Sequence, residues 1–179
     1  MSYTPTVNIA PTCITTGDGK YSQAGRLVAG TGLALPIVGA TFTANRAIAV
    51  PIEVPVTVTL AQLFTVNGGV AAGNTDIAIY DSAFVRKISA TPTAMSGTAT
   101  LQFFNVADTV IVAGLYYLAF VTSDATAQVW SFNLADVGLG KAMGCYVQAS
   151  AGTLPDPFVP STFLGLYVPL IGFTTRASL

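Results

Sequence analysis

The sequence contains no histidine, and Glu53 is the one glutamate among its eight acidic residues. Without histidine the chain cannot build a Ser-His-Asp or Cys-His nucleophile, or most protein zinc sites. The remaining acidic residues are aspartates, and most lie in turn sequences such as TGDGK, YDS, SDAT and PDP, where aspartate usually accepts backbone hydrogen bonds. A glycosidase would need two carboxylates facing each other across a cleft. We therefore expect a protein without catalytic activity and without a cofactor.

Charged residues are scarce as well. Lysine and arginine number seven and all charged residues make up 8% of the chain, whereas a typical soluble domain carries about 25%. No basic cluster is available to neutralise phosphates, so we expect no nucleic-acid binding. The most apolar stretch, residues 27–43, is interrupted by glycine, threonine and Pro36, so we expect no membrane insertion. The start, MSYTPTVNIAPT, lacks the basic and apolar regions of a signal peptide, which predicts synthesis in the cytoplasm.

Metal-binding patterns are equally sparse. The two cysteines, Cys13 and Cys145, lie far apart and match no metal-ligand spacing. We expect them to be small buried apolar residues rather than a disulfide. Asp76 and Asp81 are five residues apart, so on one continuous strand they would point to opposite faces. No acidic loop of the calcium-binding type is present, and we expect no metal site.

From about residue 46 the apolar residues alternate with a period of two, which is typical of β-strands. In VPVTVTLAQLFTV one face would carry Val56, Val58, Leu60, Phe64 and Val66, with Gln62 as an exception. TDIAIYD and FVRKISAT predict a hairpin that turns near Asp81, and further strands are expected in GTATLQFF, LYYLAFVT, AQVWSFN, GCYVQAS and LGLYVPLIGF. VADTVIVAG is interpreted as strand or turn, with one helical turn as the alternative, and NLADVGLGKA as a loop. Eight or nine such strands predict an all-β protein, an antiparallel, jelly-roll-like β-sandwich over residues 46–179.

Residues 1–45 differ from the rest of the chain in composition and periodicity. Pro5, Pro11, Pro36 and several glycines interrupt a largely apolar sequence without clean periodicity, and the run between Arg26 and Arg46 contains no charge. Disordered tails are usually polar and charged, which this segment is not. We therefore expect an extended N-terminal arm that lies against its own domain or against a neighbouring subunit.

The segment LYYLAFV, residues 115–121, is apolar on both faces of its predicted strand, because Tyr116, Leu118 and Phe120 alternate with equally apolar neighbours. A third layer of the same chain could cover the second face, or another subunit could. Low charge and sheet edges without lysine favour assembly. We expect self-association, with these candidate interface residues: Tyr116, Leu118, Phe120, and Leu35, Ile37 and Val38 of the arm.

Aromatic residues could form a carbohydrate-binding site, because exposed rings on a β-sandwich can stack against sugars. Core packing is the stronger interpretation for Trp130, which shares a strand face with Phe132. Tyr167 is a further candidate ring. The best exposed candidate is Phe158, in the loop PDPFVP, and Tyr146 is the second; these two are the candidate glycan contacts.

Four segments together resemble β-sandwich structural proteins of tailed bacteriophages and prophages: NRAIAVPIEVPVTVTLAQLFTV, GNTDIAIYDS, VAGLYYLAFV and LPDPFVPSTFLGLYVPLIGF. Proteins of this kind show an apolar entry strand followed by V-P-x-x-V-T-x-x, an I-Y-D strand, a P-G-x-Y-Y-L-A strand and a final L-P segment ending in P-L-I-x-x. The resemblance covers residues 45–174. Ala113 departs from the pattern, since proline usually precedes the glycine that is Gly114 here.

This resemblance implies a virion component made in the host cytoplasm, with no catalytic residue. Such proteins are head decoration or head fibre proteins, or short tail fibre or tail-tip modules; they commonly form trimers, and some bind host glycans. A short chain with an N-terminal arm suits a minor capsid protein on the capsid exterior, because a tail fibre would carry a longer shaft or coiled-coil repeats. We expect a homotrimer whose arm docks on the major capsid protein or a neighbouring copy. The alternative is a tail-fibre receptor-binding or carbohydrate-binding module. A cellular adhesion or surface-layer subunit suits the composition but lacks an export signal.

Overall fold

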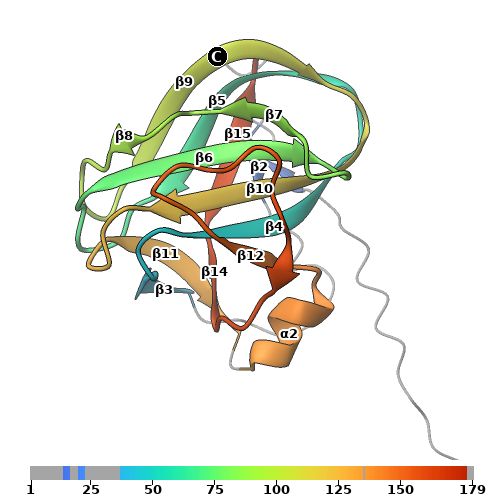
Figure 1. Cartoon of the computed structure of the whole chain (residues 1–179). Helices are drawn as coiled ribbons and strands as arrows, with labels where there is room; N and C mark the ends of the chain where they lie inside the picture. Colours follow the sequence, from blue (N-terminus) through green and yellow to red (C-terminus); the bar gives the residue numbers. More distant parts are fainter. Residues whose placement is uncertain (1–13, 17–19, 23–36, 135, 177–179) are drawn as a thin grey trace, which may run out of the picture.

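The computed structural model describes residues 14–16, 20–22, 37–134 and 136–176, and nearly all of their regular structure is β-strand. Figure 1 shows the strands wrapped into a sandwich with a short helix at one end. The strands are β1 (Ile14–Thr16), β2 (Lys20–Ser22), β3 (Ile37–Thr41), β4 (Arg46–Val54), β5 (Val58–Val66), β6 (Asn74–Asp81), β7 (Arg86–Ser89), β8 (Thr93–Ala94), β9 (Leu101–Ile111), β10 (Gly114–Thr122), β11 (Gln128–Asn133), β12 (Tyr146–Ala149), β13 (Ser161–Thr162), β14 (Tyr167–Pro169) and β15 (Ile171–Thr175), and the helix is α2 (Val137–Ala142). The predicted all-β sandwich is confirmed.

All strand pairs are antiparallel and form three sheets. The largest has the order β13-β12-β4-β10-β6-β7, with β8 also pairing with β6; the second has the order β1-β2-β15-β5-β9, and the third β14-β11-β3. The chain passes repeatedly between sheets, from β4 to β5, β5 to β6 and β9 to β10. Neighbours within a sheet are therefore mostly distant in sequence, as a jelly-roll-like path requires.

The two smaller sheets form one continuous layer. Leu170 lies between β14 and β15, accepts a hydrogen bond from Val66 N at 3.1 Å and donates one to Trp130 O at 2.7 Å. A bridge between Asn67 and Val129 joins the same two sheets. The principal core lies between this layer and the largest sheet, and it receives side chains from β4, β5, β6, β9, β10, β11 and β15.

β5 departs from the simple alternation predicted for it. Against β15, Ala61 forms a bulge, because Gln62 and Leu60 pair with the consecutive residues Thr174 and Thr175. Against β9 the extra residues lie on β9 itself, where residues 106–108 separate Asn105 and Thr109, the partners of Gln62 and Leu60. Since a bulge inserts one residue, Leu60 and Leu63 both reach the principal core although they are three apart. The predicted face that joined Leu60 to Phe64 is wrong for this reason, and Val56 lies exposed before the strand begins.

The hairpin predicted near Asp81 is confirmed, since β6 pairs with β7. Asp81 shapes the turn, because its Oδ1 accepts hydrogen bonds from Ala83 N and Val85 N, each at 3.0 Å. VADTVIVAG, interpreted as strand or turn, completes β9 and continues towards β10. The interpretation of NLADVGLGKA as a loop is wrong, because its last part forms α2, with Asp136 as the N-cap residue.

The described parts of residues 1–45 belong to the sheets. β2 pairs with β15, β1 pairs with β2, and β3 pairs with β11. The sequence predicts a sandwich that begins at residue 46. The sandwich also includes these earlier strands, because their backbones pair with strands of the sheets. The remainder of the proposed arm, including Leu35, lies outside the described residues.

Candidate functional site

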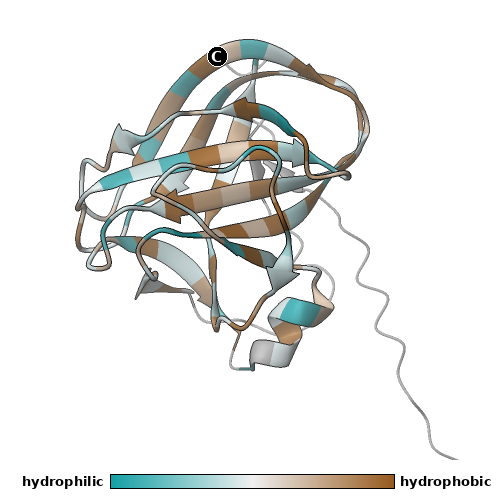
Figure 2. Ribbon diagram, in the orientation of Figure 1, coloured by the Kyte–Doolittle hydropathy of each residue, from teal (hydrophilic) through white to brown (hydrophobic). Residues whose placement is uncertain are grey.

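A third layer covers the outer face of the largest sheet. Figure 1 shows the loop between β12 and β13 crossing β6 and β10, and its side chains Leu154 and Phe158 pack on a second apolar cluster. Figure 2 shows no strongly hydrophilic position along β10, in agreement with burial of both its faces. Small side chains on the sheet, Ala49, Ala78 and Ala119, are fully buried beneath this layer. The second apolar face of β10 is therefore covered within one chain.

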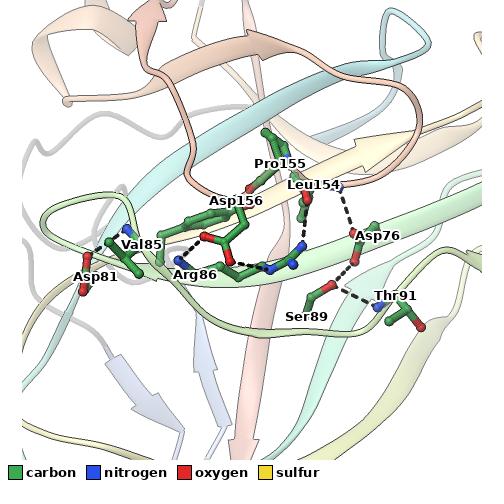
Figure 3. Close-up of polar contacts among 10 residues, drawn as sticks. Asp76, Asp81, Val85, Arg86, Ser89, Thr91, Leu154, Pro155 and Asp156 are labelled. Carbon is green, nitrogen blue, oxygen red and sulfur yellow. Dashed lines mark hydrogen bonds and ion pairs between the residues drawn. The ribbon is translucent and has the colours of Figure 1, made fainter.

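Asp76 anchors this loop from the middle of the sheet (Figure 3). Its side chain is 1% exposed. Oδ1 accepts a hydrogen bond from Ser89 Oγ at 2.7 Å, and Oδ2 accepts one from Leu154 N at 2.9 Å. A buried carboxylate needs such donors to offset its lost hydration. Asp76 is thus a structural acceptor, and no group of metal-ligating side chains gathers in the described part of the chain.

Arg86 and Tyr80 hold the next residues of the loop. Arg86 Nη1 donates to Leu154 O at 2.8 Å, and its Nε lies 3.7 Å from Asp156 Oδ2 (Figure 3). The Tyr80 hydroxyl donates to Pro155 O, and burial raises the pKa of Tyr80 above its ordinary value. The loop is consequently tied to the sheet at three successive residues.

The two candidate glycan contacts belong to an aromatic cluster in this layer. Phe158 is only 2% exposed and packs against Tyr80, with ring centroids 5.6 Å apart. Phe84 stacks on Tyr117 at 4.5 Å, and Tyr146 meets Phe84 edge-on at 5.4 Å. The expectation that Phe158 is exposed is wrong, because its ring fills the space above the alanines of the sheet. Tyr146 is half-buried at the margin of the cluster.

The remaining aromatic candidates are separated from this cluster. Trp130 is half-buried on β11, and Phe132 lies in the principal core. Tyr167 is half-buried on β14 and lines an open groove with Arg46. The four candidate rings do not converge on one platform.

The predicted interface residues of β10 are also part of the interior. Tyr116, Leu118 and Phe120 are 7%, 0% and 0% exposed, because the opposite layer of the sandwich covers them. They offer no free surface to a second copy. Val38 is half-buried against the same core, and Ile37 of β3 pairs through its backbone with Phe132 of β11.

One group of exposed apolar side chains lies along β9. This strand is 11 residues long and lies at the end of its sheet, and among the described residues it pairs only with β5. Leu101, Phe103 and Val110 of the strand are 44%, 41% and 64% exposed, and Val112 just beyond it is 57% exposed. Figure 1 shows β9 along the margin of the molecule. The sequence reveals its apolar composition but not its place at the edge.

Polar contacts fix the middle of this edge. Gln62 Nε2 donates to Asn105 Oδ1 at 2.7 Å on the outer face of the sheet. Asp108, the one charged residue of β9, is bound in a two-point ion pair by Arg176, with Nη2 to Oδ1 and Nε to Oδ2 both at 2.7 Å. The charge of the edge is thus neutralised within the chain.

Comparison with protein-family models gives no match, and comparison with curated proteins gives no significant relative. Among the residues that the structure describes, no helix has both the length and the apolar character needed to cross a membrane.

Proposed function

We propose that this protein is a non-catalytic structural protein that assembles with copies of itself through the edge of β9. The observation that carries the proposal is the length and composition of that edge. The other edge strands among the described sheets have 2 to 5 residues, whereas β9 has 11.

Long edge strands are normally avoided in monomeric proteins. They expose a row of N–H and C=O groups on which another strand can pair, and proteins usually protect them with lysine, proline or a covering loop. β9 contains neither lysine nor proline, and its pairing with β5 is irregular only at residues 106–108, so that regular edge remains on both sides of them. Since its only charge is already paired with Arg176, a second strand would meet no unpaired charge there.

Apolar side chains would add to such pairing. Phe103 meets Phe64 edge-on, with centroids 5.9 Å apart, and stays 41% exposed at the surface. Leu101 lies beside it, and Val110 and Val112 lie towards the other end of the strand. Covering these side chains yields roughly 25 cal/mol per Å² of apolar surface.

The proposed setting of this assembly is the exterior of a phage virion. Its support is the resemblance of residues 45–174 to β-sandwich virion proteins, together with the very low charge of the chain. In this proposal three copies close a ring, in which β9 of one copy pairs with an edge of the next. The major capsid protein is the proposed neighbour. Since β1, β2 and β3 belong to the sandwich, the attachment is proposed for the remainder of residues 1–36.

Light scattering on wild type and on the double variant F103K/V110K tests the assembly. We expect wild type to have the mass of a trimer, and the variant to be a folded monomer because pairing would bury the two lysines. Val159→Lys is the control, since Val159 is 62% exposed and lies in the loop outside β9. A wild-type monomer at every concentration, or a double variant of unchanged mass, would refute the proposal.

A further inference from the structure

An open groove with a volume of about 240 Å³ lies at the end of the sandwich between β3, β4, β12 and the segment before β14. Its floor is apolar and consists of Phe42, Ile48, Val147 and Phe163, all buried. Phe42 packs edge-on against Phe120 of the principal core, with centroids 5.5 Å apart. The floor is therefore part of the rigid interior.

Phe163 is held in place by two close approaches. A Cβ atom at Gly140 of α2 would lie 2.4 Å from its ring, and one at Gly165 would lie 2.8 Å from it. Both glycines thus allow the backbone to pack directly on the ring. These contacts fix one wall of the groove before any ligand arrives, which lowers the ordering cost of binding.

Arg46 is the one charged residue of the lining. It precedes Ile48 by two positions on β4, so it shares the face that forms the floor and lies at its outer end. Within the described part of the chain, its guanidinium has no carboxylate partner and no hydrogen-bond acceptor. The groove thus has one positive charge that the described residues leave uncompensated.

The rim adds hydroxyl groups and apolar side chains. Thr41 and Thr43 are exposed on one side, and the ring of Tyr167 is half-buried on the other. Leu164 is 65% exposed beside them. A guanidinium binds a carboxylate through two parallel hydrogen bonds. Hydroxyls and an aromatic ring suit the hydroxyls and the apolar face of a pyranose.

We infer that this groove binds one carboxylate-bearing sugar ring, a hexuronic acid residue, with Arg46 holding the carboxylate. The volume is below the range of about 300 to 1,000 Å³ typical of sites for larger ligands, which fits a single ring. The groove is open to solvent, so the rest of a glycan chain can leave it. This site is separate from the β9 edge and from the buried Phe158, and it goes beyond the proposed assembly.

Titration of the isotope-labelled full chain with glucuronic acid, followed by NMR, tests the inference. We expect millimolar binding that shifts amides of β3, β4 and β14, and at least tenfold weaker binding of glucose, which lacks the carboxylate. Benzoate, a carboxylate without sugar hydroxyls, should also bind at least tenfold more weakly.

Two variants complete the test. Arg46→Gln should weaken glucuronic acid binding about tenfold or more, with an unchanged fold because the guanidinium supports no described contact. Lys141→Gln, which removes an exposed positive charge on α2, should bind like wild type. No glucuronic acid binding, equal binding of glucose or benzoate, or an unaffected Arg46→Gln variant would each overturn the assignment.

Discussion

Asp76 Oδ2 accepts a hydrogen bond from Leu154 N at 2.9 Å, across 78 residues of sequence. This contact joins the sheet to the loop that covers its outer face, and it explains how a strand with two apolar faces remains inside a single chain. The same carboxylate also binds β7, because Asp76 Oδ1 accepts a hydrogen bond from the Ser89 hydroxyl.

Asp76→Ala should lower the free energy of unfolding by about 2 to 4 kcal/mol, since it leaves a buried N–H and a hydroxyl without their acceptor. Urea unfolding followed by circular dichroism measures the change. Asp108→Ala is the comparison variant and should have a markedly smaller effect, because its ion pair with Arg176 is exposed. Equal effects of the two substitutions would contradict the anchoring role of Asp76.

Phe158→Ala should destabilise the protein by about 3 to 5 kcal/mol, because it empties the space between Tyr80 and the alanines of the sheet. Val159→Ala, at the exposed neighbouring position, should change stability by no more than about 0.5 kcal/mol. Thermal unfolding of both variants measures the difference. If Phe158→Ala were as stable as wild type, the third layer would not be packed as described.

The two glycines of α2 should respond differently to alanine. Gly140→Ala should destabilise by about 1 to 3 kcal/mol, because the new Cβ would meet the Phe163 ring at 2.4 Å. At Gly138 the nearest atom is Oδ1 of the capping Asp136 side chain at 3.0 Å, which need shift only slightly, so Gly138→Ala should be close to neutral because better helix propensity offsets the adjustment of the cap. Chemical denaturation of both variants gives the sign of each effect. A stabilising Gly140→Ala would show that Phe163 does not pack on the helix backbone.

The turn at Asp81 should make stability depend on pH. A hydrogen bond from Lys87, with further ones from Val85 and Ala83, lowers the pKa of Asp81 in the folded state. A lowered folded pKa gives stability that is present above the unfolded value of about 3.9 and is lost as the pH falls through the folded value. Asp81→Asn should therefore be less stable than wild type near neutral pH, and the two should converge in acid. Melting temperatures measured across this range test the sign, and a gap that widens in acid would contradict it.

Much of the fold can be predicted from the sequence because its signals are local. The alternation in TDIAIYD and the turn at Asp81 predict the β6–β7 hairpin. The double apolar face of β10 leaves two alternatives open, a third layer of the same chain or a second subunit, and the structure shows the first. The helix α2 is not predicted from the sequence because Gly138 and Gly140 lower its helix propensity. Glycine is needed at position 140 because the helix backbone packs there on the ring of Phe163, which is distant in sequence.

The candidate sites are harder to predict because they depend on which elements meet. Phe158 lies in a proline-rich loop, which usually indicates exposure, yet three polar contacts from β6 and β7 hold that loop on the sheet. The bulge at Ala61 and the edge position of β9 follow from pairing between strands, which local periodicity does not encode. Arg46 and Tyr167 are 121 positions apart and meet only in the folded groove.

Residue-resolved amide hydrogen exchange along β9 tests the central claim most directly. In the two regular parts of β9, residues 101–105 and 109–111, alternate amides pair with β5 and the others point to the free edge of the sheet. If copies assemble through this edge, the outward amides should be as protected as the inward ones in wild type, and should exchange rapidly in F103K/V110K. Rapid exchange of the outward amides in wild type, at concentrations where light scattering reports an oligomer, would show that assembly uses another surface.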